Sequence, residues 1–251
     1  TSIKEKETIS LLAYETKSIR LIIQVDNIEL WHPDNPHLYS LAVTVSKRNK
    51  AIDEFYTQFG IREVKIDSQK VQLLLNGEPI FLRGLARHEV FAGASDGEEY
   101  RGIEGIYKDM LMMKEINANL LRTTHYPQHP ATYILSDRLG LLIWNEIPVF
   151  WFGSDEFDLQ RLERKIAKGM WLEMIYRDYN RPSVIFWSSC NECGAEKQRS
   201  LYLKDMYEAA YLVDGTRLVV QSAAGADTKD ATHLECDLIG ITSYYKGEFR
   251  P

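Results

Sequence analysis

The sequence predicts an α/β fold that follows a β-rich segment. Residues 1 to 66 alternate polar and apolar side chains as antiparallel strands do, whereas short apolar runs alternate with helical stretches from about Asp67 onward. Strands that alternate with helices indicate parallel βα units. The run Val184 to Trp187, directly after Pro182, is typical of a strand buried on both faces of a parallel sheet. We therefore predict two domains, at 1–66 and 67–251.

In the first domain, two stretches favour strands because they are rich in β-branched and apolar residues, Ile19 to Val25 and Leu38 to Val45. A turn cluster at 32–36 separates them, and the charged stretch 47–50 predicts a hairpin tip. This pattern is compatible with part of a β-sandwich.

In the second domain, Asn76-Gly77 predicts a small hairpin that leads into the first parallel strand. Apolar residues at helical spacing predict helices, and Gly140 suits a helix C-cap. The predicted strands lie near 80–88, 118–123, 141–146, 183–190, 218–222 and 237–243, and the helices at about 103–116, 129–138, 157–179 and 198–212.

Composition limits the class of protein. The 251 residues are 45% hydrophobic and 26% charged, with a net charge of −6, values that are ordinary for a soluble protein. The acidic balance argues against a nucleic-acid surface, and no apolar run has membrane-spanning length. No signal peptide is visible, so the sequence does not indicate a compartment.

Three cysteines do not suggest a disulfide framework. Cys190 and Cys193 have the C-x-x-C spacing of redox and zinc sites, so a metal or redox protein is one reading. A second pair of ligands is missing, which favours two thiols that simply flank a strand end.

Polar groups end three of the predicted strands: Arg122 and His125, then Asn145-Glu146, then Asn191-Glu192. Each has a structural explanation, since Glu192 could open the next helix and the basic pair could form a buried ion pair. Several such ends in one chain favour a shared site, because parallel strands end at the same edge of a sheet.

Tryptophans offer flat stacking surfaces for a ligand or fill the core. We assign Trp171 and Trp187 to the core. Trp151, in the loop after the third predicted strand, is a candidate for the rim of the site.

Two long motifs carry a family resemblance. NLLRTTHYP (119–127) and RDYNRPSVIFWSSCNE (177–192) resemble the two signatures of glycoside hydrolase family 2, which contains β-galactosidases, β-glucuronidases and β-mannosidases. FLRGLARHE (81–89) and DLIGITSYY (237–245) resemble its first and sixth barrel strands, and 30–41 and 59–64 its immunoglobulin-like domain. The resemblance implies an incomplete (β/α)8 TIM barrel of about six strands, preceded by an immunoglobulin-like β-sandwich segment.

The resemblance also implies a reaction, retaining hydrolysis of terminal β-glycosides of the galactoside or glucuronide type, with a carbohydrate as the partner. Glu192 would be the acid/base and Asn191 would hydrogen-bond the sugar 2-hydroxyl. Arg122 would orient the nucleophile, and the remaining candidates for substrate contact are His88, His125, Tyr244 and Trp151.

The family nucleophile is a second glutamate at the end of the seventh barrel strand, and this sequence stops after the sixth. Glu89 and Glu146 lie at strand ends without matching that motif. We therefore expect a fragment that is inactive alone and that uses no cofactor, metal or membrane contact. A homo-oligomer is one assembly that we consider for it. The alternative is a non-catalytic carbohydrate-binding or scaffold protein with the same fold.

Overall fold

The computed structural model describes residues 3–89, 102–224 and 230–242. Its centre is a parallel sheet of six strands in the order β11-β10-β9-β8-β7-β6. The strands are β6 (Gly84–Arg87), β7 (Leu120–Thr123), β8 (Leu142–Glu146), β9 (Val184–Asn191), β10 (Leu218–Ala224) and β11 (Leu238–Thr242). All six predicted strands are confirmed, and their sequential order is that of an incomplete TIM barrel.

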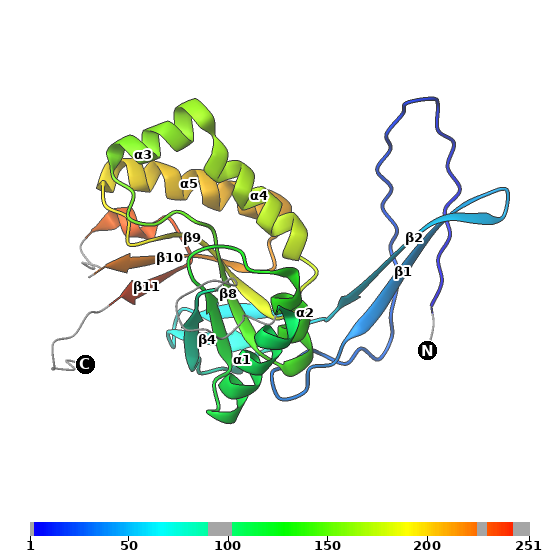
Figure 1. The fold of residues 1–251 in the computed structure, drawn as a ribbon, viewed down its shortest axis with the longest axis horizontal. Helices are drawn as coiled ribbons and strands as arrows, with labels where there is room; N and C mark the ends of the chain where they lie inside the picture. Colours follow the sequence, from blue (N-terminus) through cyan, green and yellow to red (C-terminus); the bar gives the residue numbers. More distant parts are fainter. Residues whose placement is uncertain (1–2, 90–101, 225–229, 243–251) are drawn as a thin grey trace.

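Helices cover the outer face of this sheet (Figure 1). They are α1 (Ile103–Glu115), α2 (Pro130–Leu139), α3 (Ser154–Asp158), α4 (Ile166–Asp178) and α5 (Glu196–Val213), with a 3-10 turn η2 at Ala231–Leu234. Gly140 is the predicted C-cap of α2, at φ 70°, and a side chain there would collide with the carbonyl oxygen of Pro33. No helix within the described ranges is long and apolar enough to cross a membrane.

The single long helix predicted at 157–179 is wrong. The chain forms α3, then a π-helical turn η1 at Leu159–Arg164, and then α4. Lys165 separates the last two in the left-handed conformation, at φ 54°, which interrupts the helical hydrogen bonds. The sequence continues in helical spacing across this break, so periodicity could not reveal it.

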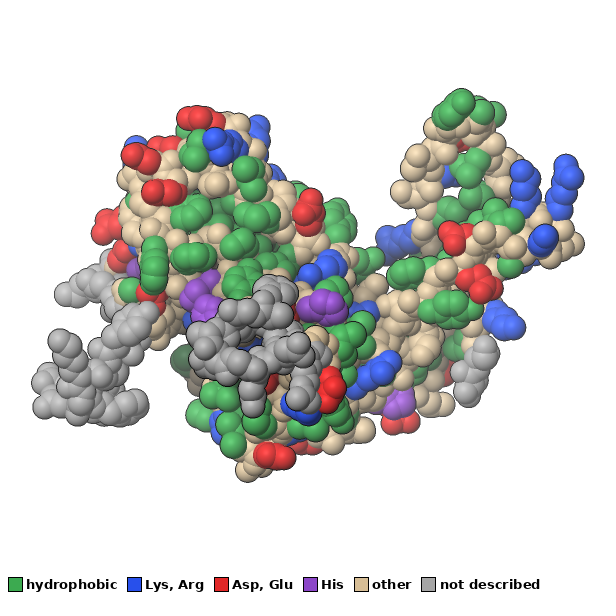
Figure 2. All heavy atoms as spheres, in the orientation of Figure 1, with side chains coloured by type: hydrophobic (Ala, Val, Ile, Leu, Met, Phe, Trp, Pro, Cys, Tyr) green, Lys and Arg blue, Asp and Glu red, His purple; other side chains and the backbone are tan. Residues whose placement is uncertain are grey.

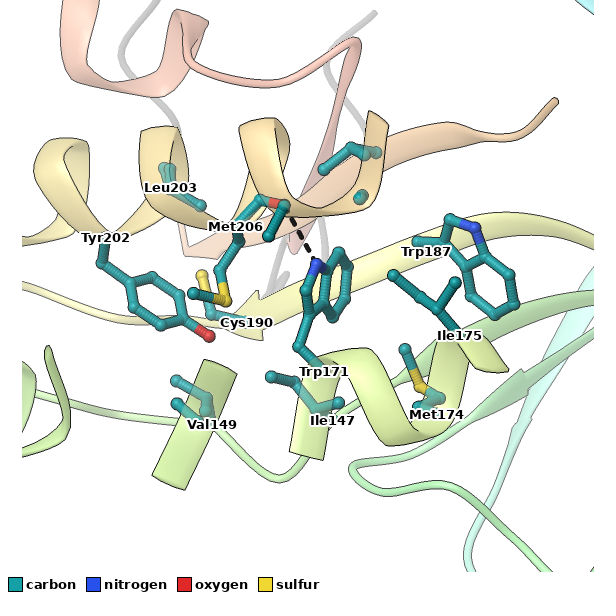
Figure 3. Packing of buried hydrophobic residues seen from close by; sticks show 14 of the residues in the cluster. Ile147, Val149, Trp171, Met174, Ile175, Trp187, Cys190, Tyr202, Leu203 and Met206 are labelled. Atoms are coloured by element: carbon teal, nitrogen blue, oxygen red, sulfur yellow. Dashed lines mark hydrogen bonds between the residues drawn. The ribbon is translucent and has the colours of Figure 1, made fainter. Parts of the chain in front are cut away.

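The main core lies between the sheet and helices α3, α4 and α5 (Figure 3). Trp171 and Trp187 are fully buried there, as predicted, and the Trp171 indole donates to the backbone oxygen of Met206 over 2.9 Å. A second cluster fills the inner face of the sheet, where Trp31 and Leu75 pack on strands β8 to β10. Burial on both faces explains why all eight residues of β9 are buried.

The N-terminal region is a projecting arm (Figure 1). Its hairpin pairs β1 (Tyr39–Lys47) with β2 (Lys50–Phe59) in antiparallel register, which confirms the second predicted strand and the hairpin tip. The predicted strand at 19–25 is wrong, since no described segment forms a ladder with these extended, exposed residues. Figure 2 shows apolar side chains along this arm. Phe55 and Tyr56 of β2 are exposed.

A three-stranded antiparallel sheet connects the arm to the barrel: β3 (Val64–Asp67), β4 (Gln72–Leu75) and β5 (Glu78–Pro79). Asn76 and Gly77 form its hairpin turn with positive φ, as the sequence predicts. This sheet spans the proposed boundary between 66 and 67, so the division into domains stays a prediction.

Candidate active site

Polar side chains meet where β7, β8 and β9 end. Arg122 lies in β7, Glu146 ends β8, and Ser188 and Asn191 lie in β9. Parallel strands deliver their carboxyl ends to one edge, and in barrel enzymes that edge carries the site. The structure therefore places these four side chains at the edge of the sheet where barrel enzymes have their active sites.

Glu146 is the centre of this arrangement, although it lies at a strand end without matching the nucleophile motif. Its side chain has no exposed surface. One carboxylate oxygen accepts from Arg122 over 2.8 Å and from Ser188 over 2.8 Å, and the other contacts His125 Nδ1. A buried carboxylate is tolerated only with such partners, so Glu146 fixes the positions of Arg122 and His125.

Arg122 also contacts strand β9. The terminal nitrogen that donates to Glu146 donates to Asn191 Oδ1 over 2.7 Å. The guanidinium lies 5.5 Å from the centre of the Trp144 ring, an arrangement that favours the cation. The ion pair considered for these basic residues thus exists between Arg122 and Glu146, and it lies within the candidate site.

Asn145, beside Glu146, points to the helices because strand side chains alternate. It accepts from the Tyr133 hydroxyl over 2.8 Å and donates to Asp178 over 2.9 Å. Burial raises the pKa of both Tyr133 and Asp178, while Arg177 acts to lower them. This network anchors the end of β8 from behind.

Glu192 directly follows β9 and is partly exposed. Its backbone takes the left-handed conformation, at φ 51°, and its N–H donates to the carbonyl of Ser222 over 2.7 Å. One of its carboxylate oxygens accepts the indole N–H of Trp151 over 3.0 Å. Glu192 does not open α5, which begins at Glu196.

The other predicted residues lie around this group. His88 follows β6 and is exposed, with its ring edge-to-face against His125 at 5.6 Å between centroids. Tyr244 lies outside the described residues. The structure thus brings together Arg122, His125 and Asn191, with His88, Trp151 and Glu192 at the margin.

The two thiols of the C-x-x-C spacing are buried. Cys190 contacts the Gln221 side chain at 3.9 Å, and the Cys193 sulfur accepts the N–H of Phe152 over 3.4 Å. Their mutual hydrogen bond raises the pKa of Cys190 and lowers that of Cys193. Within the described ranges, no three side chains are grouped so that they could hold a metal ion.

A half-barrel with carboxylates at its strand ends is the arrangement expected of part of a barrel enzyme that uses carboxyl groups for catalysis. Residues 64–247 match the family described as "Glycosyl hydrolases family 2, TIM barrel domain", and residues 1–62 match "Glycosyl hydrolases family 2". The chain therefore belongs to glycosyl hydrolase family 2.

Individual proteins that the chain resembles are consistent with this family assignment. The chain is 35% identical over 209 residues to a β-galactosidase of Thermoanaerobacter pseudethanolicus, covering 80% of this chain and 26% of that protein. The β-glucuronidase of Bifidobacterium dentium in complex with coumarin-3-O-glucuronide aligns with a TM-score of 0.77 and 28% identity, over 88% of this chain and 36% of that one. The β-glucuronidase of Ruminococcus gnavus in complex with D-glucuronic acid aligns with a TM-score of 0.75 and 31% identity, over 88% and 37%. The chain thus spans about a quarter to a third of the length of these relatives.

Proposed function

We propose that this chain supplies the acid/base side of a site that hydrolyses terminal β-glycosides with retention of configuration. The observation that carries the proposal is the position of Glu192. It directly follows Asn191 at the end of β9 and is partly exposed, and Asn191 belongs to a polar network fixed by the buried carboxylate of Glu146. Relatives named as β-galactosidase and β-glucuronidase support this reaction class.

A retaining enzyme uses two carboxyl groups about 5–5.5 Å apart. In the first step, Glu192 gives its proton to the glycosidic oxygen while the bond from that oxygen to C1 breaks and the nucleophilic carboxylate bonds to C1. In the second step, ionised Glu192 takes a proton from water as the water oxygen bonds to C1 and the nucleophile leaves. The family nucleophile belongs to the strand after β11, so turnover is a property of the full-length protein.

The network gives the other residues their proposed roles. Asn191 binds the sugar 2-hydroxyl, a contact that strengthens in the transition state. Arg122 holds Asn191 and faces the nucleophile, while His125 and His88 contact the sugar from the β6 and β7 side. Either a β-galactoside or a β-glucuronide fits the relatives' names, and substrate assays decide between them.

The test is Glu192→Gln in the full-length gene product. General acid catalysis contributes about 10²- to 10⁴-fold, so hydrolysis of a phenyl β-glycoside should fall by that factor. A dinitrophenyl β-glycoside should lose less in its first step, because its leaving group needs little protonation. Glu208→Gln, an exposed carboxylate on the outer face of α5, is the matched control and should leave both rates unchanged.

Equal rates for Glu192→Gln and the unaltered protein on both substrates would overturn the assignment. If the unaltered protein binds β-glycosides without hydrolysing any of them, the alternative of a non-catalytic carbohydrate-binding protein is the better description.

A further inference from the structure

The loop after β8 is attached to the segment after β9. The N–H of Trp151 donates to the carbonyl of Asn191 over 3.0 Å, and the N–H of Asn191 donates to the carbonyl of Val149 over 2.8 Å. Further on, the N–H of Gly194 donates to the carbonyl of Phe152 over 2.9 Å. These bonds keep the aromatic residues 150–152 in register with the Asn-Glu pair.

Both residues that meet across this seam have unusual backbones. Trp151 has φ 59° and Glu192 has φ 51°, in the left-handed region that residues other than glycine seldom adopt. Such conformations persist where the surrounding structure holds them, and they cluster at functional sites. Here they turn the indole and the carboxylate toward each other.

The Trp151 side chain is held and yet open. It is 70% exposed, although its N–H donates to Glu192 over 3.0 Å. The ring of Phe150 packs edge-to-face on it at 5.7 Å between centroids, and the Phe150 ring also lies 5.6 Å from the ring of His125. An aromatic wall therefore runs from the polar network to the solvent, past Glu192.

We propose that Trp151 and Phe150 form the binding platform for an aromatic leaving group, and that the Trp151 N–H positions the Glu192 carboxyl. This inference rests on the proposed function and assigns the side of the site on which each part of the substrate lies. The terminal sugar meets Asn191, which is buried, and Arg122, which is half-buried. The acid/base acts at the oxygen between sugar and leaving group, so the leaving group extends outward from Glu192, along Trp151.

The two roles of Trp151 separate by substitution. Trp151→Phe keeps an aromatic ring and removes the N–H, whereas Trp151→Leu removes both. Since the indole is exposed, neither change opens a cavity in the core. Tyr176→Leu is the matched control, because Tyr176 is an aromatic residue that is 60% exposed on the outer helix α4.

The platform is tested with the full-length protein on phenyl and hexafluoroisopropyl β-glycosides of whichever sugar the unaltered protein hydrolyses. These two leaving groups have similar acidity, and only the first carries a ring. Contacts between aromatic rings change rates by about two- to twelvefold. Trp151→Leu should lower kcat/KM for the phenyl substrate by such a factor relative to the other, and Trp151→Phe and Tyr176→Leu should keep the ratio of the unaltered protein.

The positioning role has two readouts. Trp151→Phe should lower kcat for the phenyl substrate more than for a dinitrophenyl substrate, because only the former needs the proton of Glu192. In the 251-residue chain labelled with ¹⁵N, the indole N–H resonance that Trp151→Phe removes should shift in Glu192→Gln and stay in place in Glu208→Gln.

The outcomes distinguish this inference from the proposed function. If Glu192→Gln abolishes turnover of the phenyl substrate while both Trp151 variants keep the rates and ratios of the unaltered protein, the platform and the positioning role are wrong and the proposed function stands. If Glu192→Gln leaves turnover intact, the proposed function fails and this inference fails with it. An indole resonance that does not respond to Glu192→Gln would overturn the positioning role on its own.

Discussion

Glu146→Gln tests whether a buried carboxylate organises the site. The substitution keeps the shape of the side chain and removes its charge, so Arg122 loses its ionic partner and His125 loses a carboxylate contact. Breaking a buried ion pair from one side costs about 3–5 kcal/mol. Arg122 and His125 keep 21% and 23% of their side chains exposed, so water compensates in part. We expect the free energy of unfolding to fall by about 3 kcal/mol, at the lower end of that range.

The assay is urea unfolding of the 251-residue chain, followed by tryptophan fluorescence. For a chain of this size the expected loss moves the midpoint down by about 1 M. Glu63→Gln is the matched control, because Glu63 forms an exposed ion pair with Lys65 at 2.7 Å. Surface pairs contribute about 0–1 kcal/mol, so this variant should unfold close to the unaltered chain. Equal midpoints for the two variants would refute the central role of Glu146.

Three further predictions concern other parts of the chain. Burial alone would favour the neutral acid at Asp214, but Arg217 at 2.7 Å holds the pKa of Asp214 below its ordinary value of 3.8. The unfolded chain therefore binds more protons near and below pH 3.8, stability falls as the pH drops through this range, and Asp214→Asn should flatten that part of an acid-unfolding curve. Cys190 and Cys193 should bind no stoichiometric zinc and form no regulatory disulfide; zinc in elemental analysis of unchelated protein, or a disulfide found by mass spectrometry after mild peroxide, would contradict this. The 251-residue chain should hydrolyse no nitrophenyl β-glycoside and should associate through its exposed apolar arm; turnover abolished by Glu192→Gln, or a strictly monomeric sedimentation profile, would count against these two expectations.

The sequence predicts the barrel part of the fold well, because its signals are local. The apolar run that became β9 and the glycine at the end of α2 carry their own physical reasons, burial on two faces and a left-handed cap. The prediction of a strand at 19–25 is wrong for the opposite reason. A strand exists only with a hydrogen-bonded neighbour, and residue preference does not supply one. The break at Lys165 was not predicted, because a single left-handed residue does not change the spacing of apolar residues in a helical pattern.

The same distinction holds at the site. Arg122, His125, Asn191 and Glu192 were visible as polar groups at strand ends. The role of Glu146 was not, because a carboxylate after a strand reads the same whether it caps a turn, faces substrate or lies buried among donors. The contact between Trp151 and Glu192 could not be predicted from the sequence either, since it depends on two left-handed backbone conformations and on hydrogen bonds between loops.

Under the proposed function, the geometry around Asn191 would let the ion pair of Glu146 and Arg122 serve sugar recognition. A side-chain amide offers one acceptor oxygen and two N–H donors, and which end faces the substrate depends on its partners. Arg122 occupies the oxygen of Asn191 from a position that Glu146 fixes. On the proposed function, the Asn191 nitrogen would donate to a sugar hydroxyl oxygen, from a position that is held before substrate arrives. A donor aimed in advance loses little in reorganisation as charge develops in the transition state. Under the proposed function, Glu146 would thus act on the sugar through Arg122 and Asn191 without contacting it.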